Sequence, residues 1–334
     1  MRLHFLVGLL LIASLMHPAT RIDADEMKIF RIGTGGIGGT YYPVGGLIAQ
    51  AISNPPGSRA CQDGGSCGVP GLIAVAQSSN GSVANVNAIR GNLLESGFVQ
   101  SDVAYWAATA TGIFSGESRA GNLRAIANLY QESVHLVARK DSAINSVHDL
   151  RGKRVSLDEP GSGTLVGARI ILRSYGLIEA DLEPEYTKPT LASEKMRAGE
   201  LDAFFIVAGY PTSSVQSLAE SGDIKLIPID ANIRNSILLA FPFFSQDRIP
   251  YDAYPKLTAV ETIGVNALWV VSSNEDEKLV YDITKALWND NTRKILERGH
   301  PKGAQITREN ALKGIGIPLH PGAKRFYDET RTAN

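Results

Sequence analysis

The sequence predicts an α/β protein made of two lobes with a similar plan. Short apolar runs alternate with amphipathic helical patterns along most of the chain, which is typical of largely parallel sheets covered by helices on both faces. In each of two blocks, a loop rich in Gly, Ser and Thr follows an apolar run, at residues 33–42 and 159–164. The 334 residues are enough for two domains of ordinary size. We therefore expect two α/β lobes that face each other across a cleft.

The chain begins with a segment that has the features of a secretory signal peptide. Arg2 gives a basic start, residues 3–16 are mostly apolar, and the small residues Ala19 and Ala24 are suited to cleavage. We expect removal of residues 1–24 and export of the rest to the periplasm; an uncleaved membrane anchor is the alternative. The formal net charge of −1 does not indicate binding to nucleic acid or to an acidic membrane surface.

Two cysteines follow in the first block. Cys61 and Cys67 are separated by the segment Gln-Asp-Gly-Gly-Ser, which contains turn-forming residues. An exported protein can keep a disulfide, so we expect these cysteines to close a small loop. A metal site would need further ligands nearby, and the surrounding sequence offers none.

The first block starts with a strand and the glycine-rich loop. Apolar residues spaced by three and four predict a helix over residues 44–52, with Pro43 in its first turn. Ser82 is placed to cap a second helix, which we expect to end at Gly97. The predicted strands of this block cover residues 28–33, 72–76, 98–104, 123–129 and 134–139.

The second block repeats this order. A strand near Val155 leads into the loop at residues 159–164, and a helix follows from Leu165 to Gly176. After residue 229 the pattern weakens, and residues 241–251, with their prolines and aromatic residues, predict a packed loop. The other predicted elements are a helix over 191–198, a buried strand over 203–207, a helix after Thr212, a strand over 267–271, and helices over 275–288 and 323–330.

The loop at residues 33–43 favours binding of an anion. Glycine lets the backbone turn sharply and approach a ligand, and the N–H groups at the start of a helix attract negative charge. Gly33, Gly35 and Gly38 also match the dinucleotide motif GxGxxG, which is weak by itself. That alternative needs an acidic residue at the end of the second strand, where residues 77–79 are Gln-Ser-Ser. We therefore favour a small carboxylate over a nucleotide phosphate.

Five segments in a fixed order carry a family resemblance: Gly33–Pro43, Gly81–Asn85, Gln100–Ala104, Asp149–Thr164 and Pro318–Gly322. Together they resemble the TAXI family, the solute-binding subunits of tripartite ATP-independent periplasmic (TRAP) transporters, over nearly all of the mature chain. The resemblance implies a type II periplasmic binding protein fold with the ligand in the cleft between the lobes. It places two hinge strands near Ser133–Val137 and Ile263–Val270. Lobe one would comprise residues 25–132 and 271–334, and lobe two residues 133–270 with the hinges.

The resemblance also implies a function. Family members bind small organic anions, among them glutamate, 2-oxoglutarate and related dicarboxylates, and deliver them to a permease driven by an ion gradient. We expect a monomer without a cofactor that passes such an anion to a fused TRAP permease. The expected ligand-binding residues are Gly35, Gly36, Gly39, Thr40, Tyr41, Ser79, Asn80, Gln100, Ser101, Ser162, Gly163, Thr164, Gly209 and Pro211. Each has a structural alternative, such as a tight turn for the glycines, a helix cap for the serines and a core position for the tyrosine.

Catalysis is not expected. The histidines are scattered, and the sequence has no spacing typical of a catalytic triad, a metalloprotease or a P-loop. Two other functions stay open: a periplasmic ligand-sensing module of a receptor, and an exported enzyme on the same scaffold. No single arginine can be assigned to a ligand carboxylate, because four are candidates: Arg31, Arg90, Arg139 and Arg169.

Overall fold

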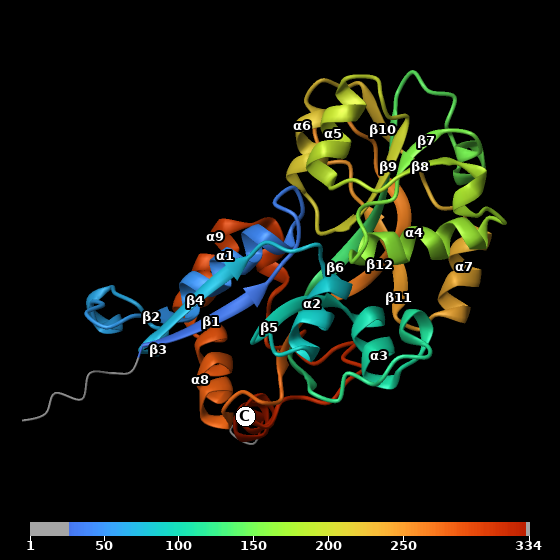
Figure 1. Cartoon of the computed structure of the whole chain (residues 1–334). Helices are drawn as coiled ribbons and strands as arrows, with labels where there is room; N and C mark the ends of the chain where they lie inside the picture. The colour runs from blue at the N-terminus through green and yellow to red at the C-terminus, as the bar shows by residue number, and fades with distance from the viewer. Residues whose placement is uncertain (1–26, 332–334) are drawn as a thin grey trace, which may run out of the picture.

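The computed structural model describes residues 27–331. The predicted signal peptide, residues 1–24, lies outside this range. Within the described range, no helix is both long enough and apolar enough to cross a membrane. Figure 1 shows two lobes joined by two long strands, β6 (Leu123–Arg139) and β12 (Val260–Ser272).

Lobe one contains the N-terminal part of the chain and the C-terminal helices. Its elements are β1 (Lys28–Gly33), α1 (Tyr41–Ile52), β2 (Ser53–Asn54), η1 (Cys61–Asp63), β3 (Val69–Pro70), β4 (Leu72–Gln77), α2 (Ser82–Arg90), β5 (Ser96–Gln100), α3 (Ser101–Thr109), η2 (Gly112–Phe114), α8 (Glu277–Leu287), α9 (Asp290–Gly299), η5 (Pro301–Gln305) and α10 (Pro321–Arg331). The neighbours β4, β1 and β5 are parallel. The loops after these strands therefore meet at one edge of the sheet.

Lobe two is formed by the middle of the chain. Its elements are η3 (Val147–Leu150), β7 (Arg154–Ser156), α4 (Gly163–Ser174), η4 (Glu179–Asp181), β8 (Glu183–Glu185), α5 (Pro189–Arg197), β9 (Ala203–Ala208), α6 (Ser213–Ala219), β10 (Ile224–Leu226), α7 (Ala231–Ala240) and β11 (Phe244–Ile249). Here β8, β7 and β9 are parallel neighbours. The loops after β7 and β9 face the loops of lobe one.

One sheet runs through both lobes, in the order β4-β1-β5-β12-β6-β9-β7-β8, with β10 paired to β6 and β11 paired to β12. Residues 267–271 of β12 pair with β5 in lobe one, whereas residues 260–265 pair with β11 in lobe two. Residues 133–138 of β6 pair with β9 in lobe two. Both long strands therefore cross between the lobes. The residue limits that we expect for the moving lobes stay a prediction.

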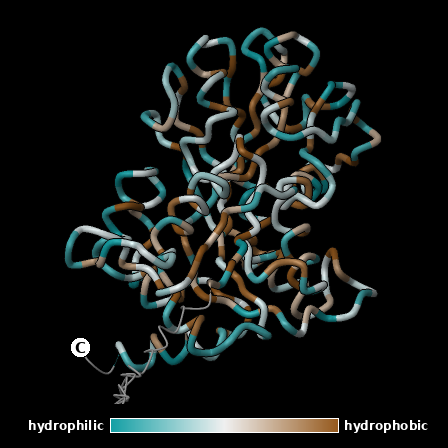
Figure 2. Tube along the Cα trace, turned by 60° about the vertical axis from the view of Figure 1, so that its left-hand side comes forward, coloured by the Kyte–Doolittle hydropathy of each residue, from teal (hydrophilic) through white to brown (hydrophobic). Residues whose placement is uncertain are grey.

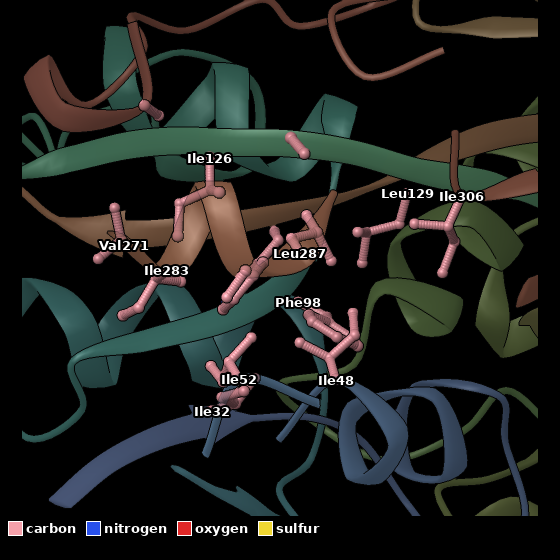
Figure 3. Close-up of a cluster of buried hydrophobic side chains, with 14 of the residues drawn as sticks. Ile32, Ile48, Ile52, Phe98, Ile126, Leu129, Val271, Ile283, Leu287 and Ile306 are labelled. Atoms are coloured by element: carbon pink, nitrogen blue, oxygen red, sulfur yellow. The ribbon is translucent and has the colours of Figure 1, made fainter. Parts of the chain in front are cut away.

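Hydrophobic side chains from distant segments form a core in lobe one, which Figure 3 shows in close-up. Ile32 of β1, Ile48 of α1 and Phe98 of β5 pack in one cluster with Leu129 of β6 and Ile283 of α8. All five are fully buried. Lobe two has separate clusters on the two faces of β9. Along the whole trace, apolar residues gather on the central strands and polar residues on the outer turns (Figure 2).

The α/β class and the Cys61–Cys67 disulfide are confirmed. The sheet is mixed rather than largely parallel, because β6 and β12 pair antiparallel with their neighbours. The strands predicted over residues 123–129 and 134–139 form one continuous strand, β6. A single long strand is what lets the chain pass from one lobe to the other without a turn.

The strand predicted over residues 98–104 is wrong in its second half. Strand β5 ends at Gln100, and Ser101 begins helix α3. Val103, Trp106 and Ala107 are buried on one face of this helix, at a spacing of three and four that the strand interpretation did not take into account. The change matters for the site, because a helix now begins where a strand was expected to continue.

Other boundaries also differ. Helix α2 ends at Arg90 and Gly91 follows it, so Gly97 belongs to β5 and does not end a helix. Residues 241–251 contain strand β11, which pairs with β12, and not only a packed loop. Helices α7 and α9 were not predicted at all. In α7 only Ile237 is buried, so the helix has little of the apolar face on which sequence interpretation depends.

Candidate ligand-binding site

A cavity lies between the lobes and encloses about 480 Å³ of empty space, including its open mouth. Lobe one contributes the loops after β1 and β4 and the end of β5, and lobe two contributes the loop after β7, the start of α5 and the end of β9. These are carboxyl ends of strands in the two parallel parts of the sheet, where α/β proteins bind their ligands.

Four helices begin at this cavity besides α5, whose first residue, Pro189, has no N–H group. Thr40, Gly81, Gln100 and Ser162 precede the first residues of α1, α2, α3 and α4, and all four line the cavity. Each of these helices has nine or more residues. The first N–H groups of a helix have no partner within it, and the dipole adds about half a positive charge there. The cavity can therefore attract negative charge through backbone groups alone.

The glycine-rich loop brings its backbone close to the other lobe. A Cβ atom on Gly38 would lie 2.8 Å from Cγ2 of Thr190 in lobe two. In lobe two, a Cβ atom on Gly163 would collide with the side-chain amide of Gln100. Glycine at these two positions is what permits the lobes to approach this closely.

The hydroxyl groups that we expected to bind ligand are largely used by the protein. Ser162 Oγ accepts a hydrogen bond from Leu165 N (3.0 Å), and Thr164 Oγ1 accepts one from Val207 N (3.0 Å). Thr40 Oγ1 donates to the carbonyl of Gly209 in lobe two (2.6 Å). Thr40 and Thr164 would therefore offer a ligand chiefly their backbone N–H groups, whereas the N–H group of Ser162 already donates to the carbonyl of Glu159 (3.1 Å).

Three carboxyl groups also line the cavity. Tyr41 OH donates to Glu132 Oε2 (2.7 Å), and burial raises the pKa of Glu132 to about 8. Burial also raises the pKa of Asp158 to about 7. Glu159 lies 3.6 Å from Lys188 Nζ, and its pKa is raised by burial in spite of that cation. Among the described residues that line the cavity, none is Lys, Arg or His.

A second layer of charge lies behind the wall. Asp102, in the first turn of α3, is buried, and burial raises its pKa to about 7. Its negative charge contributes to the raised pKa of Glu132. Lys302 of η5 is only 2% exposed, and burial lowers the pKa of its ammonium group to about 8. Within the described part of the chain, no cluster of three or more His, Cys, Asp or Glu residues is arranged to hold a metal ion.

Most of the expected ligand-binding residues meet at this cavity. Those that line it are Gly35, Gly36, Gly39, Thr40, Tyr41, Asn80, Gln100, Ser162, Gly163 and Thr164. Other residues line the cavity but were not among the expected ligand-binding residues: Gly81, Ser82, Glu132, Asp158, Glu159, Pro189 and residues 206–208. A signal for Glu132 was present, since it is the only carboxylate within the long apolar strand at residues 123–139.

Four expected residues lie behind the wall instead of in it. Ser79 Oγ donates to the carbonyl of Thr34 (2.9 Å), and Ser101 is buried in the first turn of α3. The carbonyls of Gly209 and Pro211 are occupied by side chains of lobe one. Direct contact with a ligand is therefore no longer expected for these four.

Comparison with known proteins assigns the family. The profile of the NMT1-like family matches residues 32–330. The chain belongs to the NMT1-like family. Among solved structures, PhnD1 from Prochlorococcus marinus, in complex with methylphosphonate, has 12% identity and a TM-score of 0.52, over 92% of this chain and 98% of that one. A protein from Bordetella bronchiseptica RB50 has 16% identity and a TM-score of 0.53, over 89% and 82%.

A third structure is the alkanesulfonate-binding protein SsuA from Xanthomonas axonopodis pv. citri bound to MOPS, with 16% identity and a TM-score of 0.47, over 91% and 84%. At these identities the likeness concerns the fold. From the likeness to PhnD1, the NMT1-like chain has the type II periplasmic binding protein fold, as predicted. Its membership of the TAXI family stays a prediction.

The buried carboxyl groups predict a fall in stability as the pH rises. Burial raises the pKa values of Glu132, Asp158 and Asp102 in the folded protein, so between about pH 5 and pH 8 these three carboxyl groups bind more protons in the folded state than in the unfolded state. The lowered pKa of His135 acts in the opposite direction below about pH 6.5, so the effect of the carboxyl groups is clearest above that pH. The free energy of unfolding should decrease across this window, and denaturant titration at a series of pH values measures it.

The control is Glu132→Gln, which keeps an acceptor for Tyr41 but cannot ionise. Each pKa unit of difference corresponds to about 1.4 kcal/mol, so the variant should lose clearly less stability over the window than the wild type. Equal pH slopes in the two proteins would contradict the assignment of Glu132 as a group that is protonated when the cavity is empty.

Proposed function

We propose that this protein is an exported solute-binding protein that captures a small organic anion in the periplasm and delivers it to a TRAP-type permease. The observation that carries the proposal is the convergence of four helix N-termini, at Thr40, Gly81, Gln100 and Ser162, on one cavity between two lobes. Such ends stabilise carboxylate and other oxyanions without a charged side chain. No chemical turnover is part of the proposal.

The lobes touch each other around the cavity, which supports capture by closure. On one side, Ala84 N donates to the carbonyl of Gly161 (3.0 Å) and Asn80 Nδ2 to that of Pro160 (3.0 Å). On the other side, Thr40 reaches the carbonyl of Gly209. A ligand in this cavity would be contacted by both lobes, so separation of the lobes would open the way for its entry and release.

The carboxyl groups favour an amino acid over a simple dicarboxylate. A ligand with only negative groups would place one of them near Glu132 and Asp158, which is compatible only with both carboxyl groups protonated, because like charges close together in a buried site are costly. An amino acid such as glutamate can direct a carboxylate to the helix N-termini and its ammonium group to these two side chains. Charge-assisted hydrogen bonds of that kind are strong. Glutamate therefore fits better than 2-oxoglutarate.

A thermal-shift panel tests the ligand class. It contains L-glutamate, L-glutamine, 2-oxoglutarate, succinate, methylphosphonate and a neutral sugar. L-glutamate should give the largest rise in melting temperature, because a ligand at 100 times its Kd stabilises the folded state by about 2.7 kcal/mol. A larger shift with methylphosphonate would favour a tetrahedral oxyanion, and a shift with the sugar alone would overturn the anion proposal.

Substitution of Glu132 tests the role of the carboxyl groups. Glu132→Gln should weaken L-glutamate binding at least about tenfold, since a hydrogen bond between charged groups is lost. Binding of 2-oxoglutarate should weaken far less, because that ligand has no ammonium group. Calorimetric titration gives both affinities, with Glu200→Gln, at an exposed position of lobe two, as the matched control. Equal losses for the two ligands would contradict the ammonium assignment.

The transport role has its own test. In cells that keep the permease but lack this protein, uptake of labelled glutamate at low concentration should fall to background, and the intact gene should restore it. Uptake that persists in the deletion strain would contradict delivery to the permease and would favour the receptor-linked sensing module.

A further inference from the structure

The loop after β9 and the first two residues of α6, together residues 209–214, lie beside the cavity but are bonded to lobe one. Thr212 Oγ1 and Ser214 Oγ both donate to the carbonyl of Gly38, at 2.6 and 2.9 Å. The carbonyl of Gly209 accepts from Thr40 Oγ1. A Cβ atom on Gly209 would lie 3.1 Å from Cγ2 of Thr40, so the two backbones are in close contact. All three hydrogen bonds cross from lobe two to the glycine-rich loop of lobe one.

A second segment of lobe one holds the same loop from another side. His300 Nε2 lies 3.2 Å from the carbonyl of Pro211. His300 Nδ1 accepts from the backbone N–H of Lys302 (3.0 Å), so Nε2 carries the proton and donates. The ammonium group of Lys302 lies 3.7 Å from the centre of the Tyr210 ring, a cation–π contact in a buried setting. Four consecutive residues, 209–212, therefore each contact lobe one.

A buried chain of hydrogen bonds links this loop to strand β6. The backbone N–H of Thr212 donates to Tyr254 OH (3.1 Å), and Tyr254 OH lies 2.9 Å from His135 Nε2. His135 Nδ1 lies 2.9 Å from the carbonyl of Ser133 and must donate to it. Nε2 is then the acceptor, and the hydroxyl of Tyr254 donates to it. Burial lowers the pKa of His135 to about 4, which keeps this tautomer neutral at ordinary pH.

We propose that residues 209–214 form a clasp that keeps the lobes closed. His135, on strand β6 that crosses between the lobes, positions this clasp through the hydroxyl group of Tyr254. Gly38 and Thr40, which the clasp holds, lie in the same short segment as Gly36, Gly39 and Tyr41, which line the cavity, and Thr40 lines it as well. A ligand that orders the glycine-rich loop thus also fixes the positions of the Gly38 carbonyl and the Thr40 hydroxyl, which are the two groups that the clasp binds. The clasp sets how long a ligand stays, although none of its side chains lines the cavity. This inference rests on the proposed function in one respect, namely that closure of the lobes retains a bound ligand.

The test uses variants that each remove one contact of the clasp, and each has a control substitution of the same kind at a nearby exposed residue. Tyr254→Phe removes the hydroxyl group between Thr212 and His135 and keeps the ring, whereas Tyr251→Phe, at a residue 75% exposed, is its control. Ser214→Ala removes one bond to Gly38, and Ser213→Ala, at the exposed neighbouring position, is its control.

The share of closed molecules is measured by pulsed electron paramagnetic resonance between spin labels on Lys294→Cys in lobe one and Arg173→Cys in lobe two, both at exposed positions. It is recorded for the empty protein and with L-glutamate. Tyr254→Phe and Ser214→Ala should each lower the closed-to-open ratio about fivefold, the effect of one ordinary hydrogen bond. With L-glutamate, the dissociation rate should rise by a similar factor and the association rate should not change.

The outcomes separate the clasp from the proposed function. If both variants close to the same extent as the wild type, empty and with L-glutamate, and release it at the same rate, the clasp proposal is wrong. If L-glutamate does not bind the wild type but the variants shift the empty protein toward the open form, the clasp stands and the amino-acid proposal fails. If Tyr254→Phe does not fold, Ser214→Ala decides the question by itself.

Discussion

The passage of strand β6 from one lobe to the other is the constraint on which the site depends. Glu132 lies on this strand in the cavity wall, and His135, three residues further on, lies behind the clasp. A rotation of the lobes about this strand would change both positions together. The same strand pairs with β12 in lobe one and with β9 in lobe two, so its backbone is held on each side of the crossing point. Ligand contact and lobe closure are thus attached to one continuous piece of backbone.

Charge in the cavity comes from two opposed sources. The positive potential is produced by backbone N–H groups at the starts of α1, α2, α3 and α4, which cannot be neutralised by a change of pH. The negative potential comes from side chains, chiefly Glu132 and Asp158, whose pKa values are raised by burial into the neutral range. An empty closed cavity can therefore keep these carboxyl groups protonated and avoid an unpaired buried charge. A bound ammonium group would favour their ionised form, so ligand binding and loss of a proton are linked.

Local signals in the sequence were sufficient for the parts of the site that lie at helix starts. A Gly, Ser and Thr loop before an amphipathic pattern predicted the walls at Gly35–Tyr41 and Ser162–Thr164, because both the loop and the helix are encoded within about ten residues. The pairing of β6 with β9 and β12 depends on residues far apart in the chain, and no local pattern indicates it. His135 and Tyr254 are likewise 119 positions apart. The strand that was wrongly extended past Gln100 shows that local patterns can also mislead. A short apolar segment can satisfy both the helical and the strand spacing.

The glycine-rich loop has two kinds of glycine, and the distinction explains why the expected contacts at Gly209 and Pro211 are not in the cavity wall. Gly35, Gly36 and Gly39 line the cavity, where a backbone without a Cβ atom lets a ligand come close. The N–H group of Gly39 donates to the carbonyl of Gly36 (3.0 Å), so Gly35 and Gly36 are the candidates to offer theirs to a ligand. Gly38 instead brings its carbonyl to lobe two, where Thr212 and Ser214 donate to it and Thr190 leaves no room for a side chain. Residues 209–214 are then committed to this carbonyl and to η5, and their polar groups are not free for a ligand. The loop therefore serves both ligand contact and lobe closure: Gly38 takes part in closure, and Thr40 takes part in closure and also lines the cavity.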